Sequence, residues 1–243
     1  MSLNIKSFKD LGIKLFADGA DKNTMIKMAS LDYISGLTTN PTLMKKAGIK
    51  DYRDFCVDIL ANIAEKPISF EVFSDDFKEM RRQALEIAGW GKNVYVKIPI
   101  TNTKNESSGP LLRDLTNNGV KVNVTAITTL GQVRHIVGYM NRDVASYISI
   151  FAGRVADTGV DPIPTMRGAL DLISERLPLC ELIWASPREL FNVIQANEIG
   201  CHIITATNDV LNKLQIIGKD LEGYSLDTVK MFSDDAIAAG YKL

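Results

Sequence analysis

The chain has 243 residues, of which 46% are hydrophobic and 23% charged, and its formal net charge is −1. A chain of this length suits a single α/β barrel of about 250 residues, and it can bury a core that needs no disulfide or metal. The near-neutral charge argues against a nucleic-acid surface, and no stretch approaches the roughly 20 apolar residues of a membrane span.

Short apolar runs alternate with helical stretches from one end of the chain to the other. The runs are rich in β-branched and aromatic residues, as strands buried on both faces are. They predict eight strands, at residues 13–17, 34–38, 68–72, 94–98, 120–124, 147–151, 182–185 and 203–205. Between them, stretches such as 75–89 repeat apolar residues at three- and four-residue spacing, which predicts helices.

This alternation predicts a (β/α)8 TIM barrel, with residues 1–243 forming one domain. A doubly wound open sheet is the alternative, although no GxGxxG loop follows the first strand. Gly89, Gly119 and Gly200 each follow a helical run, where a left-handed C-terminal cap is common. Residues 225–239 predict an extra C-terminal helix with Ser225 as its N-cap. That helix either covers one end of the barrel or packs on a neighbouring subunit.

The three cysteines, Cys56, Cys180 and Cys201, are far apart and form neither a CxxC pair nor a zinc-type spacing. We therefore expect reduced, mostly buried thiols in a cytoplasmic protein. The first residues also lack the apolar segment of a signal peptide. Neither His135 nor His202 stands where a metal ligand or catalytic base would be expected, so we predict no metal site.

Lys97 is the most informative single residue. It lies in an apolar run whose alternation puts Tyr95 and Lys97 on one face. Lysine is rarely buried unless it is paired or functional, and burial in a barrel interior favours the neutral amine, which attacks carbonyl carbons. The alternatives are a structural ion pair with Glu71 or a side chain that extends out of the strand end.

Further polar residues stand where predicted strands end, which is where parallel barrels carry their chemistry. The carboxylates Asp18 and Glu71 could exchange protons with a water or a substrate hydroxyl, or merely cap their strands. Arg154, Ser186 and Arg188 could hold a phosphate, because guanidinium groups bind its oxygens in pairs. Ser186 is equally a good helix N-cap before a proline, and Arg188 could be a solvated helix residue. Trp184 is expected to be structural, although it stands close to a strand end and could line the pocket.

Several segments together resemble one family. They are Phe16-Ala-Asp18, Gly36-Leu-Thr-Thr-Asn-Pro-Thr42, Val96-Lys97-Ile-Pro99, Asn123-Val-Thr125, Phe151-Ala-Gly-Arg154 and Ser186-Pro-Arg188 leading into Gly200-Cys201. In this order and spacing the chain resembles the small transaldolases and their fructose-6-phosphate aldolase relatives, from residue 13 to about residue 211.

The resemblance implies a transaldolase that moves a dihydroxyacetone unit from a ketose phosphate to an aldose phosphate without metal or organic cofactor. Lys97 would form the Schiff base, Asp18 would move the substrate-hydroxyl proton, and Glu71 and Thr125 would position the catalytic water. The implied substrate-binding residues are Thr39, Asn40, Asn123, Phe151, Arg154, Ser186 and Arg188, of which the last three match the phosphate site. A cytoplasmic homo-oligomer in the pentose phosphate pathway is also implied.

Two positions separate the branches of this family. The aldolase branch has a glutamine on strand three and a tyrosine on strand six, whereas this chain has Glu71 and Phe151, as the transaldolase branch does. A fructose-6-phosphate-type aldolase remains the alternative. The surroundings of the presumed anion pocket depart from the family at Trp184 and Pro187, so a sulfonated or otherwise modified sugar also remains open. A catalytically silent sugar-phosphate binder is the rival from another class, and the joint presence of Asp18, Lys97, Glu71 and Thr125 argues against it.

Overall fold

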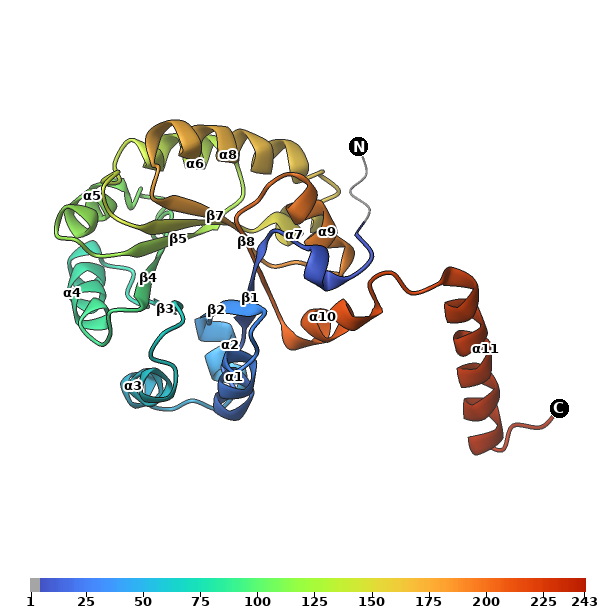
Figure 1. Ribbon diagram of the computed structural model, residues 1–243. Coiled ribbons are helices and arrows are strands. Elements are labelled where there is room, and N and C mark those ends of the chain that lie inside the picture. Colours follow the sequence, from blue (N-terminus) through green and yellow to red (C-terminus); the bar gives the residue numbers. More distant parts are fainter. Residues whose placement is uncertain (1–4) are drawn as a thin grey trace.

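The computed structural model describes residues 5–243. Its eight strands form a closed barrel in which every strand pairs in parallel with its sequence neighbours and β8 pairs with β1. Helices lie around the barrel as an outer ring (Figure 1). The predicted (β/α)8 architecture is confirmed. The alternative of an open doubly wound sheet is wrong, because β8 pairs with β1 and closes the sheet.

The strands are β1 (Lys14–Asp18), β2 (Ile34–Thr38), β3 (Ile68–Glu71), β4 (Val94–Pro99), β5 (Val122–Ile127), β6 (Ser146–Ile150), β7 (Cys180–Trp184) and β8 (Ile203–Ala206). The helices are α1 (Lys22–Ala29), α2 (Pro41–Lys46), α3 (Tyr52–Asn62), α4 (Phe77–Ala88), α5 (Gly109–Asn117), α6 (Leu130–Val137), α7 (Ala152–Asp157), α8 (Ile163–Arg176), α9 (Phe191–Glu198), α10 (Asn208–Leu211) and α11 (Leu221–Ala238). Short 3-10 helices occupy Phe8–Asp10 and Asn212–Ile216. Every predicted strand overlaps an observed one.

Helix α4 illustrates how the ring forms from the sequence. The Asp76 side chain caps its first turn by accepting the Glu79 N–H. Met80, Ala84 and Ile87 then recur at three- and four-residue spacing and are buried against the sheet. The predicted left-handed cap at Gly89 is wrong: its φ is −73°. Gly119 and Gly200 do have positive φ values, so that prediction is confirmed for both.

A second, smaller core fills the inside of the barrel. Phe16, Tyr147, Ile183, Ala185 and Ile203 are buried there, with Tyr95 and Phe151 packed against them. The Phe16 and Tyr147 rings meet edge to face at 5.9 Å, and Tyr95 stacks on Tyr147 at 3.9 Å between centroids. Gly36 makes room for this layer, because a Cβ there would lie 2.4 Å from the Phe16 ring.

The inner layer determines where polar residues reach the barrel interior. Successive strand side chains alternate between faces, so the residue two positions further along points to the same side. Asp18 follows Phe16 at this spacing, Lys97 follows Tyr95, and Thr205 follows Ile203. The apolar layer therefore forms a floor, with polar side chains directly above it at the carboxyl ends of the strands.

Helix α11 differs from the other helices. It stands apart from the barrel (Figure 1) and has no buried residue. Asp220 caps it by accepting the Gly223 N–H, so the predicted start at Ser225 is wrong. The helix does not lie over an end of its own barrel. Its apolar side chains are exposed, among them Leu226, Val229, Phe232 and Ile237. Within residues 5–243, every helix is too short or too polar to cross a membrane.

Candidate active site

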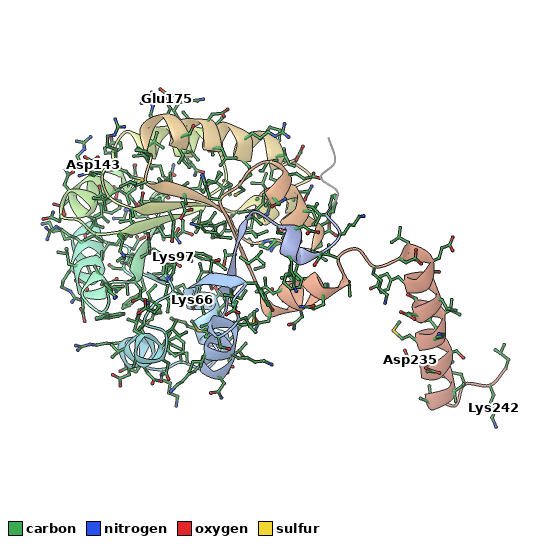
Figure 2. All side chains as sticks on the ribbon, viewed as in Figure 1. Lys66, Lys97, Asp143, Glu175, Asp235 and Lys242 are labelled. Carbon is green, nitrogen blue, oxygen red and sulfur yellow. The ribbon has the colours of Figure 1, made fainter. Side chains whose placement is uncertain are left out.

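Lys97 lies inside the ring of strands (Figure 2), and only 6% of the residue is exposed. Its Nζ donates to the Thr39 carbonyl at 3.0 Å and lies 3.2 Å from Glu71 Oε2. The prediction that Lys97 faces the interior is therefore confirmed. The alternative, in which its side chain extends out of the strand end, is wrong. The ion pair between Lys97 and Glu71, which the sequence offered as an alternative, is also present.

Asp18 is the last residue of β1 and lines the same cavity as Lys97. The Thr38 hydroxyl donates to Asp18 Oδ1 at 2.7 Å and lies 2.6 Å from the Thr205 hydroxyl. Burial raises the pKa of Asp18 above its usual value, although the Lys97 charge and the Thr38 hydrogen bond act in the opposite direction. A carboxylate with a raised pKa is a stronger base toward a substrate hydroxyl.

Asn123 is held in one orientation by two serines. Its amide donates to Ser69 Oγ at 3.0 Å, and its Oδ1 accepts the Ser149 hydroxyl at 2.7 Å. All three residues are buried. The sequence reasoning missed both serines. The signal that could have found them is their place in strand runs, where period-two alternation puts Ser69 on the face of Glu71 and Ser149 on the face of Phe151.

Two buried hydroxyls at the site have no hydrogen-bond partner within residues 5–243. They belong to Thr39 and Thr125. Buried polar groups are normally paired, so each hydroxyl can accept a water or a ligand. Thr125 comes just before Ala126, whose φ of 62° accompanies a register irregularity in β5. Such a bulge redirects neighbouring side chains at a strand end.

The opposite end of the cavity carries the two arginines. Arg188 donates to Asp157 Oδ1 at 2.9 Å and to Ser186 Oγ at 3.0 Å. The Arg154 guanidinium lies 5.5 Å from the centroid of the Phe151 ring. Ser186 has a φ of 62° and α9 begins only at Phe191, so the predicted N-cap role of Ser186 is wrong. Arg188 also precedes that helix and is not one of its residues.

These residues surround a single cavity of about 540 Å³. Ten of the eleven predicted site residues line it: Asp18, Asn40, Glu71, Lys97, Asn123, Thr125, Phe151, Arg154, Ser186 and Arg188. Thr39 is not among the lining residues and meets Lys97 through its backbone. Trp184 does not line the cavity either, because it is fully buried in the outer core. Lys46 lines the cavity and was missed; its place in the last turn of α2 gave no signal.

The Asn40 side chain accepts the Leu43 N–H at 3.0 Å and so caps α2, with Pro41 in the first helical position. This cap turns the chain sharply after β2 and keeps Asn40 at the mouth of the cavity. Within residues 5–243, no group of three or more His, Cys, Asp and Glu side chains is placed to hold a metal ion. The chemistry that the cavity offers is therefore a buried amine in contact with one carboxylate, in a space that a second carboxylate and two arginines also line.

Comparison with known proteins finds relatives that match most of this chain. A family model described as "Transaldolase/Fructose-6-phosphate aldolase" matches residues 15–242. A "Probable transaldolase" of Thermoanaerobacter sp. is 34% identical over 95% of this chain and 100% of the relative. A "Probable transaldolase" of Dehalococcoides mccartyi is 33% identical over 83% of this chain and 90% of the relative.

Similarity to solved structures concerns the fold alone. A putative lyase/mutase from Burkholderia cenocepacia matches 96% of this chain and 86% of its own, with a TM-score of 0.56. Its sequence identity is 11%, so the likeness extends to the arrangement of strands and helices and not to the site.

Proposed function

The chain belongs to the transaldolase/fructose-6-phosphate aldolase family, and on this basis we propose that it transfers a dihydroxyacetone unit between sugar phosphates through a Schiff base on Lys97. The observation that carries the proposal is the buried Lys97 amine, 3.2 Å from Glu71 at the floor of a cavity that Asp18 also lines. A sugar-phosphate binder without activity would not need a buried amine there.

The proposed reaction begins when the Lys97 amine attacks the ketose carbonyl. The carbinolamine hydroxyl then takes up a proton that Glu71 supplies through a water at Thr125 and leaves as water, so that a protonated imine remains. The Asp18 carboxylate then removes the proton of the C4 hydroxyl. The C3–C4 bond breaks, its electron pair moves into the imine to form an enamine, and the shortened aldose leaves. The enamine adds to the carbonyl carbon of the incoming aldose, whose oxygen takes back the proton held by Asp18. Water then adds to the new imine and releases the ketose and the Lys97 amine, and Glu71 recovers its proton.

The remaining cavity residues fit the other parts of the substrate. Asn123, which its two serines hold in one orientation, would bind the dihydroxyacetone hydroxyls, and Asn40 lines the same cavity. Thr39 contributes its carbonyl to Lys97. Arg154, Ser186 and Arg188 would bind the anionic group at the far end. A sulfonated sugar remains the alternative for that group, because two guanidinium forks also suit a sulfonate.

Glu71 and Phe151 favour transfer over release of free dihydroxyacetone. Phe151 lines the cavity and has no hydroxyl to activate a water on the enamine. We therefore keep a fructose-6-phosphate-type aldolase as the alternative to the transaldolase. Measuring free dihydroxyacetone with and without an aldose acceptor separates the two activities.

We also propose that the protein is a homo-oligomer, since α11 carries exposed apolar side chains and stands away from its own barrel. The three cysteines are free and buried. A cytoplasmic location, a single domain and a place in the pentose phosphate pathway stay predictions.

Trapping the covalent intermediate tests the proposed function. Incubation with a ketose phosphate and borohydride should add one reduced three-carbon unit to the peptide that carries Lys97, and Lys97→Met should lose both the label and turnover. Lys66→Met is the matched control, because that lysine contacts a backbone carbonyl outside the cavity. If Lys97→Met kept wild-type turnover, the mechanism would be wrong.

A further inference from the structure

The hydrogen-bond ladder between β2 and β3 ends abruptly at the active site. Leu37 N–H donates to the Pro67 carbonyl at 2.9 Å, and Thr39 N–H donates to the Ser69 carbonyl at 3.3 Å. The next bond in this two-residue series would join the N–H of residue 41 to the Glu71 carbonyl. Residue 41 is a proline, which has no N–H and begins α2. The backbone of Glu71 therefore has no strand partner on this side.

A tyrosine from α3 takes the place of the missing strand. The Tyr52 hydroxyl donates to the Glu71 carbonyl at 2.7 Å and accepts the Glu71 N–H at 2.8 Å. One side-chain oxygen thus satisfies both backbone groups of the residue that carries the active-site carboxylate. Since buried backbone groups are costly to leave unpaired, this contact fixes the end of β3.

Because Tyr52 replaces the missing strand contact, the Thr39 carbonyl is free to accept a hydrogen bond from Lys97. A continued ladder would direct the Glu71 N–H to the Thr39 carbonyl. Because Tyr52 accepts that N–H instead, the Thr39 carbonyl is left to accept Lys97 Nζ at 3.0 Å. Lys97 is then held between this carbonyl and the Glu71 carboxylate at 3.2 Å.

We propose that Tyr52 is a positioning residue that sets the geometry of the Glu71–Lys97 pair through the Glu71 backbone. The inference rests on the proposed function of Lys97 and deepens it. Tyr52 is not among the residues that line the cavity, so it acts through Glu71 and not on the substrate.

Tyr52 is itself well anchored. It is the first residue of α3, directly after the Asp51 N-cap. Its ring meets Phe73 at 5.4 Å and Trp90 at 6.1 Å between centroids. Burial raises the pKa of Tyr52, so the hydroxyl keeps its proton and remains a donor throughout the working pH range. A rigid, protonated hydroxyl can hold both Glu71 groups at once.

The first test is Tyr52→Phe, which removes one oxygen and keeps the ring. Transaldolase kcat should fall roughly tenfold, because a small displacement of reacting groups slows chemistry strongly. KM for the donor should stay within about twofold, since the arginine end of the cavity is untouched. Tyr139→Phe is the matched control: Tyr139 is also half-buried, lies under Arg113 at the end of α6, and should leave kcat unchanged. A loss of thermal stability with unchanged kcat would show a structural role only and overturn the proposal.

A double-mutant cycle tests whether Tyr52 acts through Glu71. If it does, adding Tyr52→Phe to Glu71→Gln should reduce kcat by less than about twofold, because the pair that Tyr52 positions is already lost. A full further tenfold loss in that background would mean that Tyr52 acts independently of Glu71, against the proposal.

A third measurement needs no sugar and keeps the two proposals distinguishable. Formaldehyde with cyanoborohydride methylates lysine amines, and peptide mass spectrometry gives the rate at Lys97 relative to Lys66. Loosening the Glu71 carboxylate removes one of the two contacts that hold the Lys97 amine, so Tyr52→Phe and Glu71→Gln should both speed methylation of Lys97 about threefold or more. If no ketose labels Lys97 in the wild type, the proposed function fails while this rate still decides the role of Tyr52. A wild-type methylation rate in Tyr52→Phe would overturn that role.

Discussion

Arg154 and Arg188 face the same end of the cavity but are held in different ways. Arg188 is tied to Asp157 and Ser186, and its hydrogen bonds hold the pKa of Asp157 below the usual value. Arg154 lies against the Phe151 ring, and among residues 5–243 it forms no salt bridge. The cationic charge at this end is therefore partly balanced at one arginine and unbalanced at the other.

Arg154→Ala should weaken binding of anionic donors. Losing a hydrogen bond to a charged group costs roughly 1.5–3 kcal/mol, and about 1.4 kcal/mol corresponds to a factor of ten. The apparent KM for a phosphorylated ketose should rise by roughly ten- to a hundredfold, while kinetics with free fructose should change little. Steady-state assays with the two donors provide the comparison.

Arg188 offers the matched comparison. Arg188→Ala leaves the Asp157 carboxylate facing the substrate anion, so the added change Asp157→Asn should recover part of the lost affinity. Equal losses on phosphorylated and unphosphorylated donors would instead assign both arginines to the fold, contrary to the anion-site proposal.

At this scale the sequence predicts residues whose type is unusual for their place. A lysine in an apolar strand run and carboxylates at strand ends are such residues, and Lys97, Glu71 and Asp18 do meet. Ser69, Ser149 and Tyr52 were missed because small polar residues and tyrosines are common in strands and helices. Alternation could place the two serines on the inner face of the barrel, but the contacts that give all three residues their role span 19 to 54 positions of the chain.

The turn after β6 and the turn after β7 approach each other more closely than side chains allow. A Cβ on Gly153, in α7, would lie 1.7 Å from the Ser186 carbonyl oxygen. Ser186 is held there in a left-handed conformation, and its hydroxyl accepts from Arg188. Because residue 153 has no Cβ, the two loops can meet at the part of the cavity that Arg154 and Arg188 line.

Gly153→Ala should force these two loops apart. Inserting a methyl group into a filled space costs about 1–3 kcal/mol, and each kcal/mol lowers Tm by about 2–4 °C in a domain of this size. Calorimetry should show that decrease, and KM for phosphorylated donors should rise with it. Gly131→Ala is the control, because its Cβ would meet nothing nearer than 3.8 Å in a helix where alanine is favoured. A Gly153→Ala protein with unchanged Tm and KM would contradict the close approach.

Element boundaries were predictable where local chemistry fixes them. Residues 34–38 form β2 as predicted, since Asn40 and Pro41 end that strand and start the next helix. The start of α9 was not predictable, because Ser186 and Pro187 resemble a helix start, whereas the chain continues as a loop to Leu190, from which Arg188 reaches Asp157. A tertiary contact overrode the local signal.

For the molecule as a whole, the proposed association between copies can be tested at α11. Val229 and Phe232 lie three residues apart, on one side of the helix, and are 60% and 62% exposed. Phe232→Glu should therefore lower the molar mass measured by light scattering toward the monomer, and should make Tm depend less on protein concentration.

Ser233→Glu adds the same charge at the adjacent position and should leave the mass of the wild-type oligomer unchanged. A wild-type protein that is monomeric at micromolar concentration would disprove the oligomer proposal outright.

The closed barrel was predictable from the alternation of strands and helices. The position of α11 was not, because its apolar stripe is equally compatible with its own barrel or with another copy. The spacing of apolar residues shows which face of a helix can be buried, but it does not show which surface covers that face.

The floor formed by Phe16, Tyr95 and Tyr147 has a kinetic consequence. It fills the barrel beneath Lys97, so the cavity opens at the carboxyl ends of the strands. In the proposed reaction, the aldose cut from the donor would therefore have to depart before the acceptor aldose could take the same space above the enamine. Turnover should therefore follow a ping-pong sequence with parallel double-reciprocal plots, in which the first product competes with the second substrate for the modified enzyme.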